Sequence, residues 1–147
     1  MMENDALSRF REAHKQNYPA ALSEIRAGKK RSHWMWYIFP QMRGLGVTFT
    51  ANYYALGSLE EAELFLRDPY LGGHLREISA ALLALDTRDA LAVFGCPDNL
   101  KLRSCMTLFA HVKDADSVFR DVLNAYYDGQ EDEKTLALLG LSHTDPA

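Results

Sequence analysis

Apolar residues recur every three or four positions along most of the chain, which is the spacing that places them on one face of an α-helix. Hardly any segment alternates between apolar and polar residues, as a half-buried strand would. The helical segments predicted from this pattern are 5–18, 19–27, 58–66, 68–85, 87–94, 98–109, 118–127 and 132–139. We therefore predict an all-α fold, a single compact multi-helical domain over residues 1–147 that is ordered from about residue 4 to residue 141.

Residues with known preferences at helix ends set the predicted boundaries. Pro19 is expected to end the first helix and to begin the second, which Gly28 then stops. Ser58, followed three residues later by Glu61, forms a capping box. Side chains that can accept hydrogen bonds from a first turn are expected to begin further helices at Asp68, Thr87, Asp98 and Asp132.

One segment, GKKRSHWMWYIFPQMRGLG (residues 28–46), combines charged residues, aromatic residues, glycine and proline more densely than any other part of the chain. Its apolar run, residues 34–39, is too short for periodicity to distinguish a buried helical turn from a short strand. Pro40 ends either structure, and we predict that residues 40–50 form an ordered irregular loop packed against the core. A functional site is expected in this stretch.

Three cations of this segment are candidates for anion binding. Lys30 and Arg31 precede the tryptophans, and Arg43 follows Pro40. An arginine offers a planar fork of N–H donors that suits phosphate or carboxylate, so these three residues are predicted to hold a phosphate. The alternative is electrostatic, since cations near the C-terminal end of a helix interact favourably with its dipole. His33, between the cations and the aromatic residues, is the histidine best placed to act as a general acid or base.

Trp34 and Trp36 point to different sides of any regular backbone. One of them is expected in the core, and the other could stack on the ring of a ligand. Gln41 carries an amide that both donates and accepts hydrogen bonds, which suits a nucleobase or a sugar hydroxyl. A purely structural alternative is that both tryptophans are buried and organise the helices around them.

A second candidate region is FGCPDNLKLRSCMTLF, residues 94–109. Asp98 is most simply a helix N-cap, but it is also a candidate acid or base. Lys101 and Ser104 follow within two turns, near the helix end where anions bind, and are predicted to contact the ligand. Cys105 has no evident activating base, so we interpret it as a small core residue.

Composition narrows the classes of function. The net charge of −4 disfavours nucleic-acid binding, and a local basic cluster on an acidic chain points instead to a small anionic ligand. The two cysteines form neither a disulfide framework nor a metal-binding motif, and no cofactor signature is present, so we predict no metal and no cofactor. The N-terminus lacks the features of a signal peptide, and no segment approaches the roughly 20 apolar residues of a membrane span. These features predict a cytoplasmic protein that does not associate with membranes.

The chain resembles a bacterial family of proteins, domain of unknown function 1810, over nearly its whole length. The resemblance is carried by the strings LSRFREAH, KKRSHWMWYIFPQ, DPYLGGHL, FGCPDNLKLRSCMTLF and DEKTLALLG. It implies a compact, mainly helical single domain and no established activity. Some members are labelled calpastatin, an inhibitor that acts through disordered repeats, whereas this chain has neither repeats nor a disordered composition. A more distant similarity of pattern is to helical proteins that process ADP-ribose and related riboflavin intermediates.

Two hypotheses of function follow. In the first, the protein binds or transforms a phosphate-bearing nucleotide or ADP-ribose-like metabolite, with His33 or Asp98 as the acid or base that cleaves an N-glycosidic bond. In the second, it is a non-catalytic domain that uses the same aromatic and basic segment as a hot spot for a protein partner.

Overall fold

The computed structural model describes residues 6–141, and within this range the chain forms nine helices and no strand. The helices are α1 (Ser8–Arg26), α2 (Met35–Ile38), α3 (Phe49–Tyr53), α4 (Leu59–Arg67), α5 (Pro69–Leu83), α6 (Ala90–Phe94), α7 (Asp98–Ala110), α8 (Ser117–Tyr127) and α9 (Glu133–Leu139). The all-α fold predicted from the periodicity is therefore confirmed. The predicted helix start at Asp5, the predicted order of residue 4 and the polar tail from Ser142 lie outside the described residues. None of the nine helices is long and apolar enough to cross a membrane.

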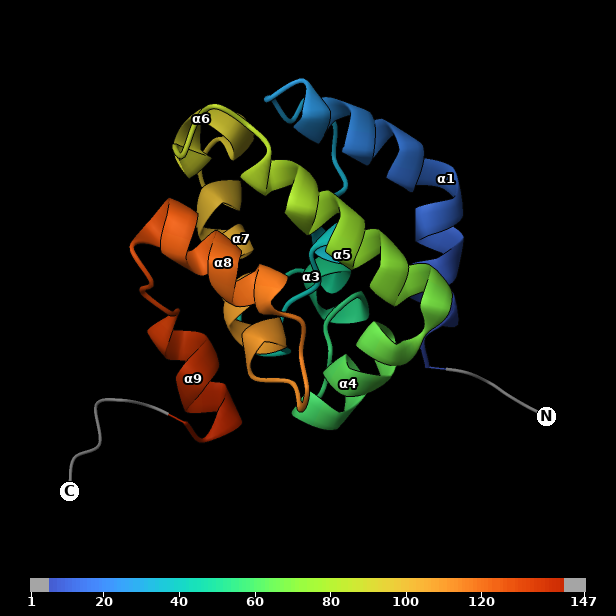
Figure 1. Ribbon diagram of the computed structural model, residues 1–147. Coiled ribbons are helices and arrows are strands. Elements are labelled where there is room, and N and C mark those ends of the chain that lie inside the picture. The colour runs from blue at the N-terminus through green and yellow to red at the C-terminus, as the bar shows by residue number, and fades with distance from the viewer. Residues whose placement is uncertain (1–5, 142–147) are drawn as a thin grey trace.

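Helix α5 is the centre of the fold, because α1, α4 and α8 all pack against it. Figure 1 shows α5 running across the molecule between α1 and α8. Its inner face consists of Leu71, Leu75, Ile78 and Leu82, which are fully buried and follow the helical spacing of the sequence. Helix α7 packs in turn against α4, α6, α8 and α9. Side chains on α7 therefore project from a helix that is supported on several sides.

The prediction that Pro19 separates two helices is wrong, since α1 runs through it without interruption. A proline inside a helix removes the N–H that would bond to the carbonyl four residues earlier, here that of Lys15. Both Lys15 and Pro19 are exposed, so water can bond to the freed carbonyl. On the other face Tyr18, Ala21 and Ile25 are buried and continue the apolar stripe. Tertiary packing thus keeps one helix where local preference favours a break.

The apolar run that begins at Trp34 forms a single helical turn, α2, and not a strand. The loop predicted over residues 40–50 is only partly irregular. Met42 pairs with Leu56 in an isolated parallel β-bridge, which fastens the start of the loop to the chain ahead of α4. Near its end the Thr48 side chain accepts a hydrogen bond from the first turn of α3, a short helix that the pattern did not predict.

Most of the predicted helix caps are observed. The side chains of Ser58, Asp68 and Asp132 accept hydrogen bonds from the first turns of α4, α5 and α9. Thr87 is not the cap of α6, because the Asp89 carboxylate accepts from the first turn instead. Asp98 is the first residue of α7 and not its cap, since its carboxylate turns away to two lysines.

Candidate functional site

One carboxylate holds the segment between α1 and α2 in place. Glu24 Oε1 accepts hydrogen bonds from the backbone N–H groups of Arg31 (2.7 Å) and Ser32 (3.0 Å). It also accepts from Trp34 Nε1 at 2.8 Å, while Ser32 Oγ donates to Glu24 Oε2 at 2.6 Å. Burial by itself would raise the pKa of Glu24, but these four hydrogen bonds lower it to about 2. Trp34, only 1% exposed, is the tryptophan that belongs to the core.

Replacing Glu24 by alanine is expected to lower the free energy of unfolding by about 2 kcal/mol, because the loop and the Trp34 indole lose their acceptor. Urea denaturation at neutral pH measures this change. Glu24→Gln, which keeps one acceptor oxygen, should cost about half as much. A Glu24→Ala variant as stable as the parent protein would contradict this role.

Two lysines and one carboxylate connect the two tryptophans. Asp98 Oδ2 lies 2.9 Å from Lys30 Nζ, and Asp98 Oδ1 lies 3.1 Å from Lys101 Nζ. Lys30 Nζ also lies 5.0 Å from the ring centroid of Trp34. Lys101 Nζ lies 4.1 Å from the ring centroid of Trp36, within cation–π range. Because two cations share one anion, this cluster carries a net positive charge at the start of α7.

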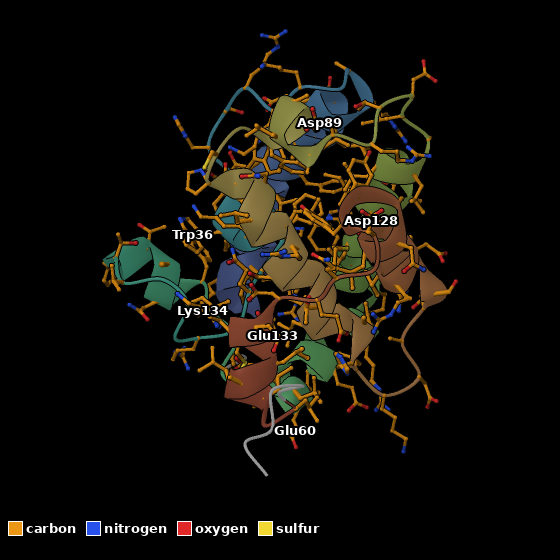
Figure 2. All side chains as sticks on the ribbon, turned by 90° about the vertical axis from the view of Figure 1, so that its left-hand side faces the viewer. Trp36, Glu60, Asp89, Asp128, Glu133 and Lys134 are labelled. Atoms are coloured by element: carbon orange, nitrogen blue, oxygen red, sulfur yellow. The ribbon has the colours of Figure 1, made fainter. Side chains whose placement is uncertain are left out.

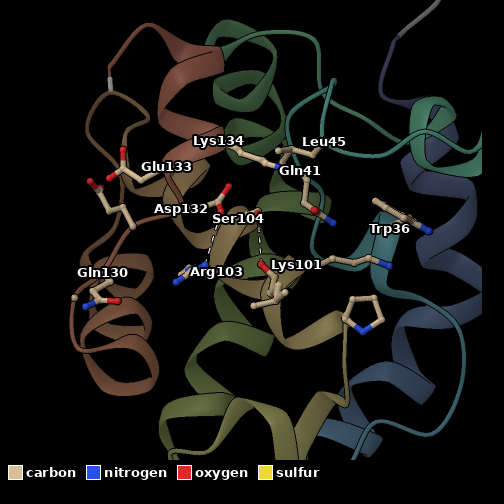
Figure 3. A pocket seen from close by; sticks show the side chains of 14 residues that line it. Trp36, Gln41, Leu45, Lys101, Arg103, Ser104, Gln130, Asp132, Glu133 and Lys134 are labelled. Carbon is tan, nitrogen blue, oxygen red and sulfur yellow. Dashed lines mark hydrogen bonds and ion pairs between the residues drawn. The ribbon is translucent and has the colours of Figure 1, made fainter. Parts of the chain in front are cut away.

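Two adjoining hollows flank Trp36 and Lys101, which line both of them. The larger has a volume of about 790 Å³ and lies between α7, the loop after α2 and the start of α9. Figure 3 shows it from close by, with Trp36 on one side and Gln130 and Glu133 on the other. The smaller, of about 180 Å³, lies between α2 and the first turns of α7. In Figure 2, Trp36 and Lys134 lie on the same face of the molecule.

The structure brings together all the predicted site residues except two. The larger hollow is lined by Trp36, Gln41, Lys101 and Ser104. The smaller is lined by Lys30, His33, Trp34, Trp36, Asp98 and Lys101. Arg31 and Arg43 line neither of these hollows. Arg31 is exposed, and Arg43 Nη2 lies 3.5 Å from the carbonyl oxygen of Ala55. Trp36 is partly exposed, as expected for the tryptophan outside the core.

Two residues that line the larger hollow each contain a buried hydrogen-bond donor without a partner within the described residues. Gln41 is only 5% exposed, and its Nε2 atom has no partner within residues 6–141. Arg103 Nε is also buried and has no partner in the same part of the chain. Ser104 Oγ, by contrast, donates to the Leu100 carbonyl at 3.3 Å. Buried donors without acceptors are uncommon in proteins, and here both belong to residues that line one hollow.

A family model described as "Protein of unknown function (DUF1810)" matches residues 4–139. The chain belongs to the DUF1810 family. This DUF1810 chain is similar to the conserved hypothetical protein Rv1873 from Mycobacterium tuberculosis, whose crystal structure matches it with a TM-score of 0.89 and 45% sequence identity. The match covers 92% of this chain and 97% of that one, so the two share the whole fold. No curated protein matches the DUF1810 chain.

Sequence reasoning missed two residues of this DUF1810 chain: Arg103, which lines the larger hollow, and Glu24, which holds the segment before Trp34 in place. A lone acid one helical turn before the Gly28 stop and a run of cations was a usable signal for Glu24, because the chain must fold back past it. Arg103 gave no such signal. Two residues from Lys101 on a helix, it lies on a different face, and it reaches the hollow only because α9 packs beside α7.

The thiols take no part in the two hollows. Cys105 is fully buried, which raises its pKa well above the ordinary value and confirms it as a core residue. Cys96 is exposed. In the part of the chain that the structure describes, no group of three or more His, Cys, Asp or Glu side chains could hold a metal ion.

Proposed function

We propose that this DUF1810 protein binds a small phosphate-bearing, nucleotide-like metabolite in the two hollows beside Trp36. One observation carries the proposal. Residues that the sequence predicts to bind a ligand, in the segments 28–46 and 94–109, line the same pair of hollows. A core alone does not require two lysines, a carboxylate, an amide and a partly exposed indole around two adjoining hollows. The volume of the larger hollow, about 790 Å³, lies within the range of small-molecule sites.

Each part of the ligand has a suitable partner in this arrangement. The Trp36 ring offers a stacking surface for a base, as aromatic side chains do in nucleotide sites. The Gln41 amide can bond to a base edge or a sugar hydroxyl. The net positive Lys30–Asp98–Lys101 cluster attracts an anion to the boundary between the hollows.

The proposed reaction, if the ligand is a substrate, is hydrolysis of an N-glycosidic bond of an ADP-ribose-like compound. His33 and Asp98 both line the smaller hollow. In this role the Asp98 carboxylate activates water or stabilises the developing sugar cation, and His33 donates a proton to the departing base. Asp98 would first exchange one of its lysine contacts for the substrate.

A thermal-shift screen with nucleotides, dinucleotides, ADP-ribose and sugar phosphates tests the proposal. A ligand at 100 times its dissociation constant adds about 2.7 kcal/mol, which moves the midpoint by several degrees. Trp36→Ala should fold and lose this shift, whereas Arg31→Ala and Arg43→Ala, which alter cations outside both hollows, should keep it. A shift that survives in Trp36→Ala, or no shift with any ligand of the panel, would reject the site.

The second candidate function, a non-catalytic interaction domain, is favoured by a different observation. Val47 and Phe49, on either side of the Thr48 cap of α3, are 93% and 82% exposed. Exposed apolar side chains of this size in one short segment suit a protein contact. If no ligand shifts the midpoint, size-exclusion chromatography of the protein and of Phe49→Ser with candidate partners becomes the deciding experiment.

A further inference from the structure

We infer that Arg103 and Gln41 form the phosphate subsite of the larger hollow, so that the ligand's phosphate lies against α7 and not against Arg31 and Arg43. The inference rests on the proposed function for the rest of the ligand. It assigns the anion-binding role to Arg103, a residue whose position on α7 gives no sign of that role in the sequence.

The Gln41 amide is held in place by its backbone and left without an acceptor. The backbone carbonyl oxygen of Gln41 accepts from the Leu56 N–H at 2.9 Å, next to the β-bridge of Met42. The side chain lines the hollow, and Figure 3 shows its amide pointing into the space beside Lys101. A buried donor without an acceptor destabilises a protein, and Gln41 Nε2 exposes less than 1 Å² of its surface. A ligand oxygen that accepts from Nε2, once the side chain shifts outward toward the hollow, recovers this loss on binding.

The Arg103 guanidinium is held in position, but not all of its hydrogen-bond donors have partners within the described residues. Its Nη2 atom lies 4.0 Å from Asp132 Oδ1, which is longer than a hydrogen bond. The other carboxylate oxygen of Asp132 accepts from the Thr135 N–H and Oγ1 at the start of α9. The guanidinium carbon lies 5.8 Å from the ring centroid of Tyr127, which supports one face of the group. The guanidinium is therefore confined, while its buried Nε lacks a partner within the described residues.

Two of the three acidic residues that line the hollow are held by other contacts. Glu131 Oε2 lies 2.6 Å from His111 Nε2 and 2.7 Å from Arg120 Nη2. Asp132 caps α9, and Glu133 is exposed at the rim. The unsatisfied groups of the wall are thus donors, and they come from two different elements. A tetrahedral phosphate can present separate oxygens to a guanidinium fork and to an amide at the same time.

The experiment compares nucleosides with their 5′-monophosphates by calorimetry, using the full chain. In the parent protein the monophosphate of the preferred base should bind about tenfold more tightly than the nucleoside, or better. Arg103→Lys, which keeps the charge but not the fork, and Gln41→Met, which keeps the shape but not the donor, should both reduce this ratio toward one. Arg67→Gln, which removes an exposed cation of α4, is the matched control and should leave the ratio unchanged.

The outcomes separate this subsite from the proposed function. A ratio that stays high in both Arg103→Lys and Gln41→Met, with circular dichroism showing the native fold, overturns the subsite and leaves ligand binding at Trp36 standing. Equal binding of nucleoside and monophosphate by the parent protein overturns it as well. If neither compound binds, and pyrophosphate does not bind either, the subsite and the proposed function both fail.

Discussion

Replacing Gly72 by alanine is expected to lower the free energy of unfolding by about 3 kcal/mol, the upper end of the range for overpacking a closely packed site. The same substitution at the next residue, Gly73, is expected to raise it by about 0.5–1 kcal/mol, because alanine is the better helix former. The two glycines are neighbours in α5, so chain length, charge and composition are identical in the two variants.

The opposite signs follow from the packing of α4 on α5. A Cβ atom at Gly72 would lie 2.0 Å from the carbonyl oxygen and 2.8 Å from the carbonyl carbon of Leu66, the penultimate residue of α4. Both are backbone atoms, so no side-chain rotation relieves the contact and the two helices must separate. A Cβ atom at Gly73 meets nothing within 4 Å.

Urea denaturation of the parent protein and both variants measures the difference. Because α4 and α5 are joined directly at Asp68, Gly72→Ala should also disturb the packing of Phe65 and Leu66, which are buried in α4. Equal effects of the two substitutions would show that the close approach at Gly72 does not limit stability.

The protein is also expected to lose about 3 kcal/mol of stability between pH 6.5 and pH 4 through His14 alone. Burial lowers the pKa of His14 from its ordinary value of 6.5 to about 4. The neighbouring His74 acts in the same direction, while the bond to the Tyr37 carbonyl and the charge of Asp68 oppose it. In the unfolded chain His14 therefore binds a proton below pH 6.5, whereas in the folded chain it binds one only at about pH 4.

The hydrogen bonds around His14 explain why it stays neutral. Its Nε2 lies 2.8 Å from the Tyr37 carbonyl oxygen, which can only accept, so Nε2 carries the proton. Its Nδ1 lies 2.9 Å from His74 Nδ1 and therefore accepts from it. His74 in turn stacks on Tyr18 with 3.6 Å between ring centroids. A proton on His14 would break the bond to His74 and place a charge in a site that is 1% exposed.

Unfolding measured in urea from pH 7.5 to pH 4.5 tests this account. The stability contributed by His14 is fully present above pH 6.5 and is lost as the pH falls toward 4. Through His14, the free energy of unfolding of the parent protein should therefore fall by about 1.4 kcal/mol per pH unit in this window. Glu24, whose pKa is about 2, adds its own loss only below its ordinary value of 4.5. His14→Gln is less stable at neutral pH but should show a much flatter dependence. Identical slopes in the two proteins would contradict the assignment.

This histidine also connects the core to the candidate site. Tyr37, whose carbonyl it binds, belongs to α2 and lines the smaller hollow. The pattern of the sequence gave His14 no role beyond a place on a helix face, since His74, its partner, lies 60 residues later.

Local rules accounted for most of the helices because each helix end and each buried face depends on residues within a few positions of one another. The stripe of Leu71, Leu75 and Ile78 predicted α5, and Asp68 with Pro69 predicted its start. The same rules gave the wrong answer at Pro19, where packing against the core outweighed the local preference for a break. The same rules could not distinguish helix from strand for the six residues after His33. These residues form a helical turn only in contact with the rest of the fold.

The sequence by itself determined the helical class, most of the caps and the two segments in which polar and aromatic residues gather, because spacing and residue type are local properties. The tertiary structure alone decided which of those residues share a hollow, that Trp34 is buried and Trp36 partly exposed, and that Arg103 joins them in place of Arg31 and Arg43. The reason is physical. A side chain's partners, burial and charge environment are set by helices that meet from distant parts of the chain, such as α9 beside α7.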